Sequence, residues 1–273
     1  CTYCIIPYAR GPVRSLPLAQ AVEQARALEG YREVVLTGIE VASWGRDLKD
    51  GSTFADLVES VCRAVPQLRV RLGSLEPRVV DEDFCRRLAA CPNFCPQFHL
   101  SLQSGSDGVL RRMHRHYDTA RYLQSVRLLQ QWFPGCAVTT DLIVGFPGET
   151  EEEFEDTLRL IERVRYDALF TFIFSPRGGT PAASMPDPTP KEEKNRRFDR
   201  LVALQNRISE EKHRAYIGRT FRVLIDGRDG DLLTARTDGG RLVRLSGGDG
   251  LIGRFRDVRI TGSTTWSLTG ELA

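Results

Sequence analysis

The sequence contains no run of about 18 or more apolar residues, so we expect no helix that crosses a membrane. It has no basic start followed by an apolar stretch, so we expect no signal peptide. Glycine and proline, with 24 and 14 residues, occur at ordinary frequencies, which argues against a disordered or fibrous chain. Hydrophobic residues make up 41% of the 273 residues, enough for a sizeable core in one or two domains.

A strong excess of charge of either sign is also absent. The net charge of +2 permits a nucleic-acid partner without requiring one. The cysteines are odd in number and irregularly spaced beyond the first four residues, so we expect reduced thiols and a cytoplasmic protein. The seven cysteines are Cys1, Cys4, Cys62, Cys85, Cys91, Cys95 and Cys136.

Strand-like and helix-like patterns alternate from residue 15 to residue 176. The predicted strands cover residues 32–38, 68–77, 98–106, 136–149 and 168–176. The predicted helices cover residues 15–30, 54–65, 81–91, 120–132 and 150–164. Alternation of this kind predicts an α/β fold with a parallel sheet and helices outside it. Together with a sixth strand implied by the opening segment, the count falls short of eight, so we expect a partial, open barrel.

The composition changes near Gly218. A long charged helix is predicted over residues 191–216, after a loop rich in glycine and proline. Short strands between glycine turns follow it, over residues 220–227, 232–238, 241–247, 253–262 and 264–272. We therefore expect an α/β domain over residues 1–216 and a small all-β barrel over residues 217–273.

The chain opens with CTYC, in which Cys1 and Cys4 stand three positions apart. Such a pair can be a redox pair, half of a zinc site or part of an iron–sulfur site. Zinc would need a second pair of cysteines, and the candidate, Cys91 with Cys95, lies in a predicted helix-to-strand turn. The residues alone leave these possibilities open, beside the possibility that the two cysteines have no metal or redox role.

Blocks along the chain resemble those of the radical S-adenosylmethionine methylthiotransferases, in the same order and at similar spacing. They span residues 1–185 and read CIIPYARGPVRS, VVLTGIE, LGSLEP, HLSLQSGSDGVLRRMHRHY, TTDLIVGFPGETEEEFEDT and SPRGGTPAA. CTYC resembles the last two cysteines of the CxxxCxxC signature of radical S-adenosylmethionine enzymes. The closing β region resembles the TRAM module, a small RNA-binding barrel. The resemblance implies a partial (β/α)6 radical S-adenosylmethionine barrel followed by a TRAM-like barrel.

The same resemblance implies two cofactors, a [4Fe-4S] cluster and S-adenosylmethionine. Cys1 and Cys4 would be two of the three cluster ligands, because the family pattern places the third cysteine four positions before Cys1, outside this chain. Family members also carry an N-terminal domain with three further cysteines that bind a second [4Fe-4S] cluster. We therefore expect an N-terminally truncated chain that is inactive alone, either a fragment of the enzyme or only a tRNA-binding module.

The substrate differs between branches of this family. PYARGPVRS, LTGIEVASWG and LGSLEP look most like the branch that modifies carbon 2 of N6-threonylcarbamoyladenosine next to the tRNA anticodon. The branch that modifies isopentenyladenosine would usually show a glutamine–asparagine pair where Ile39 and Glu40 stand, yet DALFTFIFSPRGGTPAA leans toward that branch. We expect the threonylcarbamoyladenosine activity, with the isopentenyladenosine activity as the alternative and modification of a ribosomal protein as a third, weaker possibility.

The resemblance assigns cofactor contacts to residues that mostly follow predicted strands. The assigned residues are Tyr3, Thr37, Gly38, Glu76, Gln103, Ser104, Asp141, Ile143, Gly145 and Phe174. Ile143 would line the adenine of the cofactor, and the turn at Thr37 would meet its amino group. Each of these positions could also be an ordinary turn, helix cap or solvated side chain. His99, His114 and His116 have no convincing ligand spacing, so we interpret them as structural.

Arginines alternate with apolar residues in the closing β region, for example in GRFRDVRI. Alternation places the arginines on the outer face of the predicted strands, where they could bind RNA phosphates or form an ordinary solvated surface. The predicted RNA-binding residues are Arg219, Arg222, Arg254 and Arg256. The partners implied by the resemblance are the anticodon loop of tRNA and an electron donor such as flavodoxin or ferredoxin.

Overall fold

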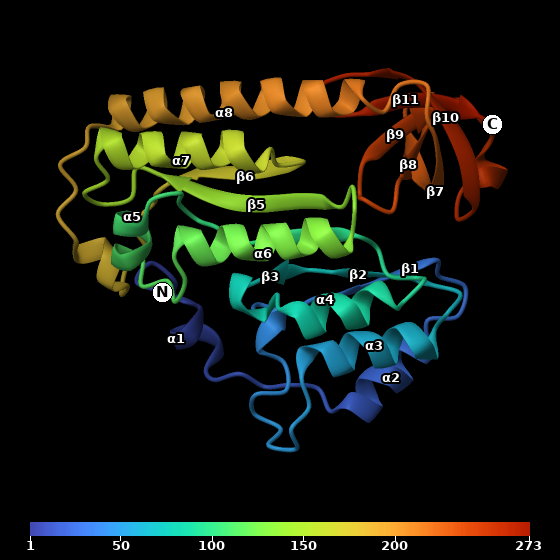
Figure 1. The fold of residues 1–273 in the computed structure, drawn as a ribbon, viewed down its shortest axis with the longest axis horizontal. Helices are drawn as coiled ribbons and strands as arrows, with labels where there is room; N and C mark the ends of the chain where they lie inside the picture. The colour runs from blue at the N-terminus through green and yellow to red at the C-terminus, as the bar shows by residue number, and fades with distance from the viewer.

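The computed structural model describes residues 1–273 as an open α/β part and a closed β-barrel joined by one long helix (Figure 1). The strands of the α/β part form one sheet of two strands and one of four, described together here as the sheet. The sheet strands are β1 (Glu33–Leu36), β2 (Arg69–Leu72), β3 (Ser74–Leu75), β4 (Gln97–Leu100), β5 (Ala137–Val144) and β6 (Ala168–Ile173). All of their pairings are parallel, as the alternation of strands and helices predicts. The predicted partial α/β barrel is therefore confirmed.

One predicted detail of the sheet is wrong. The opening segment contains no strand and instead forms the short helix α1 (Ile6–Arg10), which has Pro7 in its first turn and is followed by Gly11. Pro7 suits the first turn of a helix, because its missing N–H would have no partner there. Six strands nevertheless result, because Gly73 interrupts the predicted strand 68–77: β2 pairs with β1, and β3 pairs with β4.

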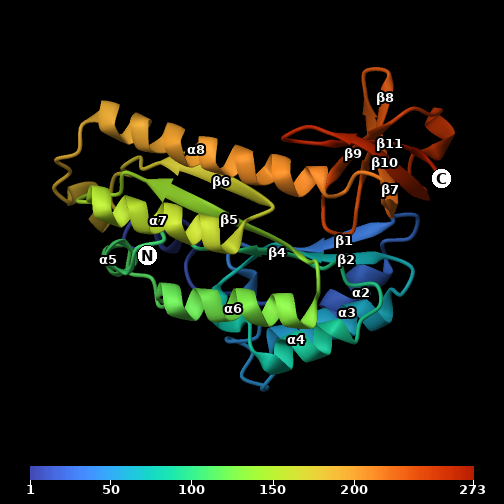
Figure 2. The same ribbon diagram turned by 45° about the horizontal axis from the view of Figure 1, so that its top comes forward.

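Helices cover one face of the sheet (Figures 1 and 2). They are α2 (Leu18–Arg26), α3 (Phe54–Ala64), α4 (Glu82–Ala89), α6 (Thr119–Trp132) and α7 (Glu151–Val164), whereas the short helix α5 (Asp107–Arg112) lies at the edge beside the N-terminus. Thr53 is the N-cap residue of α3, and Thr150 is that of α7. Each forms a complete capping box, which satisfies backbone N–H groups that the first turn leaves unpaired. A core of 38 buried side chains lies mainly between these helices and the sheet. No helix of the chain is both long enough and apolar enough to span a bilayer.

The opposite, inner face of the sheet is not covered by these helices. In β5, Leu142 belongs to the core, whereas Asp141 and Ile143 are half-buried, so their side chains point to the inner face. The register pairs Asp141 with Phe170 and Ile143 with Phe172, which places both phenylalanines of β6 on that face. The inner face therefore presents polar and aromatic side chains to a shared concave space.

The C-terminal part is a five-stranded closed barrel, as predicted. The helix α8 (Lys191–Arg214) leads into it. The barrel strands are β7 (Thr220–Asp229), β8 (Leu232–Arg236), β9 (Leu242–Leu245), β10 (Phe255–Ser263) and β11 (Leu268–Leu272). Nine buried apolar side chains fill its interior, and their alternation with exposed residues accounts for the strand pattern in the sequence.

The barrel is attached near the amino ends of the sheet strands (Figure 2). Arg71 of β2 donates hydrogen bonds to the carbonyl oxygens of Asp238 at 2.8 Å and of Thr237 at 3.4 Å, in the turn between β8 and β9. Asp167, which directly precedes β6, pairs with Arg241 of the barrel. These buried polar contacts hold the barrel at the end of the sheet opposite to the carboxyl ends of the strands.

Candidate functional site

The cysteine segment lies near the carboxyl ends of the sheet strands. Thr2 binds the last turn of α5 through its backbone N–H, which donates to the carbonyl of Met113 at 3.0 Å, and through its hydroxyl, which donates to the carbonyl of Arg112 at 2.8 Å. The carbonyl of Thr2 accepts a hydrogen bond from the N–H of Ala182 at 2.9 Å, within the 3-10 turn Pro181–Ser184. Cys1 and Cys4 are thus held on either side of an anchored residue.

An aromatic contact joins this segment to the loops that follow β5 and β6. The ring of Tyr3 meets that of Phe146 edge-on at 6.1 Å, and Phe146 meets Phe174 at 5.1 Å between ring centres. Burial raises the pKa of Tyr3 to about 12, so this side chain is a neutral phenol at physiological pH. The structure therefore brings together Tyr3 and Phe174, two of the predicted cofactor-site residues.

The surroundings of the two cysteines contain an arginine but no further thiol. Cys1 is exposed and Cys4 is half-buried, and Arg115 donates to Sγ of Cys1 at 3.1 Å. Cysteines hold iron–sulfur clusters as thiolates. No cluster of three or more cysteine, histidine or carboxylate side chains occurs that could hold a metal ion. The chain thus has two thiols at this place and no third.

Gln103 has an unusual backbone that connects β4 to β5 at this edge. Its φ of 73° lies in the left-handed region, where a residue with a side chain is strained, and strain of this kind is common at functional sites. Its N–H donates to the carbonyl of Asp141, and its carbonyl accepts from the N–H of Ile143, both at 2.9 Å. Three predicted site residues, Gln103, Asp141 and Ile143, are therefore adjacent.

Ser104 occupies a different environment, although it is the next residue. Its side chain is buried and lies 3.5 Å from the hydroxyl of Thr157 on α7, and its oxygen accepts from the N–H of Ser106 at 3.2 Å. The hydroxyl thus connects the loop after β4 to the outer helix layer. The predicted cofactor contact of Ser104 has no geometric support here.

His99 contributes to the inner face, which the sequence interpretation missed. Its Nε2 lies 3.0 Å from Oδ2 of Asp141, and its Nδ1 lies 3.1 Å from the hydroxyl of Thr139. The alternation of β4, with Phe98 and Leu100 in the core, is the signal that would have placed His99 on this face. Asp141 is therefore half-buried and has a histidine partner within hydrogen-bond distance.

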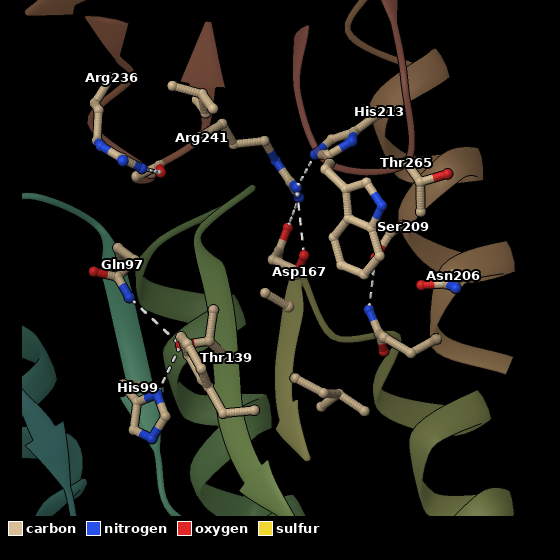
Figure 3. Close-up of a pocket in the computed structure, with 18 of the residues that line it drawn as sticks. Gln97, His99, Thr139, Asp167, Asn206, Ser209, His213, Arg236, Arg241 and Thr265 are labelled. Atoms are coloured by element: carbon tan, nitrogen blue, oxygen red, sulfur yellow. Dashed lines mark hydrogen bonds and ion pairs between the residues drawn. The ribbon is translucent and has the colours of Figure 1, made fainter. Parts of the chain in front are cut away.

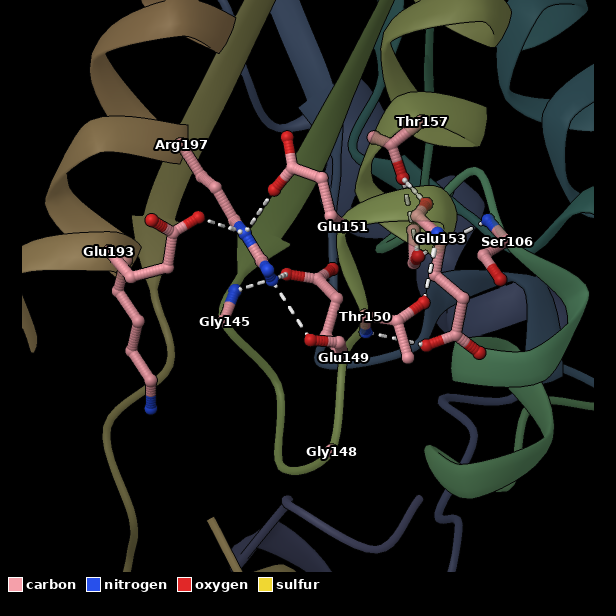
Figure 4. Close-up of polar contacts among 12 residues, drawn as sticks. Ser106, Gly145, Gly148, Glu149, Thr150, Glu151, Glu153, Thr157, Glu193 and Arg197 are labelled. Carbon is pink, nitrogen blue, oxygen red and sulfur yellow. Dashed lines mark hydrogen bonds and ion pairs between the residues drawn. The ribbon is translucent and has the colours of Figure 1, made fainter. Parts of the chain in front are cut away.

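The GFPGE segment forms a rigid loop after β5 (Figure 4). The carboxylate of Glu149 accepts a hydrogen bond from the N–H of Gly145 at 2.7 Å, and Arg197 of α8 donates to the carbonyl of Glu149 at 2.9 Å. Burial raises the pKa of Glu149 to about 7, against the opposing effects of the Gly145 N–H and Arg197. Gly145 has a φ of 68°, which a glycine adopts without strain. The loop that carries Phe146 is thereby held in one conformation.

The remaining predicted cofactor-site residues follow β1 and β3. Thr37 and Gly38 are exposed directly after β1. Glu76 follows β3, and both of its carboxylate oxygens accept hydrogen bonds from Nε of Arg78, at 2.8 Å and 3.1 Å. Glu76 therefore already has a cationic partner, whereas Thr37 and Gly38 are free to contact a ligand.

The arginines of the barrel fall into two groups. Arg228, Arg236, Arg241 and Arg244 each form an ion pair with an aspartate. The predicted RNA-binding residues Arg219, Arg222, Arg254 and Arg256 form none, and the first three are exposed. Arg219 and Arg222 instead lie over the rings of Phe221 and Phe255, at 5.0 Å and 4.8 Å from the ring centres. Uncompensated cations beside aromatic rings are features of RNA-binding surfaces.

Comparison with known families agrees with both parts of the structure. The sequence pattern of the radical SAM superfamily matches residues 1–161, and that of the TRAM domain matches residues 214–273. The chain belongs to the radical SAM superfamily. The family implies a [4Fe-4S] cluster and S-adenosylmethionine, and the positions of Cys1 and Cys4 at the carboxyl ends of the strands fit such a site.

Curated relatives cover nearly all of this radical SAM chain. It is 44% identical over 276 residues to the tRNA-2-methylthio-N(6)-dimethylallyladenosine synthase of Clostridium botulinum (strain Loch Maree / Type A3), across 99% of the chain and 61% of that protein. The protein of the same name from Acetivibrio thermocellus is 40% identical, across 100% of the chain and 58% of that protein. The chain thus spans about three-fifths of the length of these relatives.

Solved structures support the fold alone. Methylornithine synthase superposes with a TM-score of 0.52 at 20% identity, covering 75% of this chain and 58% of that one. Coproporphyrinogen III oxidase from Escherichia coli superposes with a TM-score of 0.56 at 13% identity, covering 82% of this chain and 63% of that one. Both similarities agree with the open parallel sheet described above.

Proposed function

We propose that this chain is the catalytic and RNA-binding part of a tRNA methylthiotransferase that acts on N6-dimethylallyladenosine, the isopentenyl-modified adenosine. The observation that carries the proposal is the 44% identity to a synthase of that name across 99% of the chain. The threonylcarbamoyladenosine activity that we first expected finds no support among these relatives. We therefore propose the alternative substrate, the isopentenyl-modified adenosine, in its place.

The inner face of the sheet supports the same substrate. Phe170 and Phe172 are 53% and 54% exposed although they are large and apolar, and they share this face with Ile143. A dimethylallyl group is apolar and would bury this surface, whereas a threonylcarbamoyl group carries a carboxylate. Asp141 on the same face would repel that carboxylate. The arrangement therefore favours the apolar substituent.

We further propose roles for the site residues. Cys1 and Cys4 would hold the [4Fe-4S] cluster, which together with S-adenosylmethionine supplies one-electron chemistry able to activate a C–H bond. Thr37, Gly38 and the side-chain amide of Gln103 would bind polar groups of the cofactor. The Tyr3, Phe146 and Phe174 contact would exclude water beside them.

The division of labour between the two parts is also a proposal. Residues 1–216 would carry the cluster and cofactor, and residues 217–273 would bind the tRNA through the unpaired arginines. An electron donor such as flavodoxin or ferredoxin, a third cysteine ligand and a second cluster would complete the system. The exposed Cys1 gives such a donor short access to the cluster position.

The test is a product assay on the anaerobically reconstituted protein. It is incubated with reductant, S-adenosylmethionine and tRNA that carries either dimethylallyladenosine or threonylcarbamoyladenosine. Mass spectrometry of the nucleosides should show the methylthio product with the first tRNA, together with 5′-deoxyadenosine. Product with only the second tRNA would overturn the substrate assignment. Retained tRNA binding without deoxyadenosine would support a chain that only binds RNA.

A further inference from the structure

A cavity of about 570 Å³ lies between the sheet, α8 and the barrel (Figure 3). The sheet contributes residues from β4, β5 and β6, such as His99, Thr139 and Phe170, and α8 contributes Gln205 and Asn206. The barrel contributes the turn before β9 and the segment before β11, including Trp266. The volume is within the range of sites for small organic ligands.

The cavity is separate from the cysteine edge. None of its lining residues belongs to the cysteine segment, to the GFPGE loop or to the loop after β4. Thr139 lines it near the start of β5, whereas Val144 ends that strand at the cofactor edge. At roughly 3.3 Å per residue, these two positions are roughly 16 Å apart. A group bound at the Thr139 end of the cavity is therefore distinct from the group that reacts at the edge.

Two deeply buried polar atoms in the cavity wall have no partner in the chain. Oε1 of Gln205 and Nε of Arg241 are both unsatisfied, in side chains that are only 5% and 6% exposed. The orientation of Gln205 is fixed, because its Nε2 donates to the carbonyl of Tyr166 at 3.1 Å and to the hydroxyl of Ser209 at 2.8 Å. Both atoms have almost no accessible surface, and unsatisfied buried polar atoms of this kind are few in folded proteins.

The charges around the cavity do not favour a phosphate. Arg71 pairs with Glu33 at 3.0 Å, Arg236 pairs with Asp226 at 3.2 Å, and Arg241 pairs with Asp167. Each guanidinium that lines the space is therefore already engaged by a carboxylate. An anionic group would have to displace one of these pairs, which costs free energy at a buried site.

The groups that remain available are neutral and either hydrogen-bonding or aromatic. The amide of Asn206 has no hydrogen-bond partner in the chain, and the ring of Trp266 is 70% exposed. Phe170 is 53% exposed on the sheet side of the same cavity. Aromatic faces together with amide donors and acceptors are the features that bind an unpaired nucleobase.

We propose that this cavity binds one unpaired nucleobase of the RNA, a base different from the adenine that reacts. The inference rests on the proposed function, because that function brings RNA to the barrel. The base would stack on Trp266, and its edge would meet the amide of Asn206. A free nucleoside carries the same base, so the experiment tests both RNA and free nucleosides as the source of the bound base.

The test is an abasic scan of a stem-loop RNA that contains dimethylallyladenosine, with affinities measured by fluorescence anisotropy. Removal of the base at one loop position other than the modified adenosine should weaken binding to the wild-type chain about tenfold. Asn206→Leu and Trp266→Ala should weaken binding of the intact RNA similarly and should remove the effect of that abasic site. Asn195→Leu, at an exposed position of the same helix, should bind as the wild type does.

The outcomes of these measurements distinguish a base of the RNA from a free nucleoside, and they separate this inference from the proposed function. Wild-type affinity and an unchanged abasic profile in both Asn206→Leu and Trp266→Ala would overturn the inference while leaving RNA binding, and thus the proposed function, intact. Binding of free nucleosides that depends on Asn206, with no sensitive loop position, would overturn the RNA source. Failure of every variant to bind RNA would overturn this inference and the proposed RNA binding together. Trp266→Ala alters an exposed side chain, so it does not depend on the folding of the core.

Discussion

Arg241 of the β-barrel donates a hydrogen bond to Nε2 of His213 at the end of α8, over 2.6 Å. Nδ1 of the same ring lies 2.8 Å from the carbonyl of Thr264, so this nitrogen carries the hydrogen and the imidazole is neutral. Burial, assisted by the nearby charge of Arg241, lowers the pKa of His213, although the Thr264 carbonyl and Asp167 oppose the shift. His213 is thus a titratable group within the contact between the sheet, α8 and the barrel.

The first prediction is that acid weakens this contact. Between the lowered pKa of folded His213 and its ordinary value of 6.5, the unfolded chain binds a proton that the folded chain does not. The free energy of unfolding therefore falls as the pH falls through this window. Thermal melting at about pH 7.5 and about pH 5.5 should show a smaller decline for His213→Gln than for the wild type. His116→Gln, at an exposed histidine, should decline as the wild type does; an equal decline in all three proteins would contradict the prediction.

The second prediction concerns the carboxylate at the centre of the same contact. Asp167 pairs with Arg241, pairs with Lys212 at 2.7 Å and accepts from the N–H of Val138 at 2.8 Å. Asp167→Ala should lower the free energy of unfolding by about 3–5 kcal/mol, because it leaves the buried Arg241 without a counter-charge. Urea denaturation measures the change. Asp229→Ala, which breaks an exposed pair with Arg244, should have little effect, and a comparable loss there would contradict the argument.

A third prediction tests how closely the loop after β4 packs against α7. A Cβ at Gly105 would lie 2.5 Å from Cα of Thr157, which belongs to the helix backbone and cannot move aside easily. Gly105→Ala should therefore cost about 1–3 kcal/mol of stability, measured by chemical denaturation. Gly178→Ala meets no atom within 4 Å and should be tolerated. Equal stability of the two variants would show that the loop can shift.

The fourth prediction addresses the cluster ligands. After anaerobic reconstitution with iron and sulfide, Cys4→Ala should contain markedly less iron than the wild-type chain, because a thiolate ligand is lost. Cys85→Ala is the matched control, since Cys85 is fully buried in the core away from the cysteine segment. A colorimetric iron assay measures the difference. Similar iron contents in both variants would place the iron outside the Cys1 and Cys4 segment.

The fifth prediction separates the two groups of barrel arginines. Arg222→Ala should lower the slope of log affinity for single-stranded RNA against log salt concentration by roughly 0.7, because one phosphate contact is lost. Arg228→Ala should leave the slope nearly unchanged, since Arg228 already pairs with Asp249 at 2.6 Å. Binding titrations at several salt concentrations give both slopes. An equal change in both variants would show that ion pairing within the barrel does not decide which arginines bind RNA.

The periodic spacing of apolar residues predicted the order of helices and strands, because this spacing depends on which side chains of a local stretch are buried. The five predicted strands of the sheet, the capping box at Thr150 and the closed barrel all appear. The helix cap considered for residues 103–106 is present, at Ser106. Local patterns could not show that Gly73 divides one strand between two neighbours, because that division depends on contacts with the rest of the fold.

The polar contacts of the sites were harder to predict from the sequence. Gln103, Asp141 and Ile143 were predicted from the resemblance to the family, and backbone hydrogen bonds bring the three together. The pairing of Asp167 with Arg241 joins residues 74 positions apart and has no sequence period. A histidine such as His99, without ligand spacing to another, gives no sign of its carboxylate partner until the register is known.

The length and attachment of α8 fix the distance between the barrel and the cysteine edge. Its 24 residues extend about 36 Å, and the contacts of Asp167 and Arg197 anchor the helix to the sheet near both of its ends. RNA held by the barrel would therefore present to the cysteine edge only the nucleotide that lies at one set distance along the strand. The distance along the strand between the barrel and the cysteine edge would then select the reacting adenosine, together with recognition of its base.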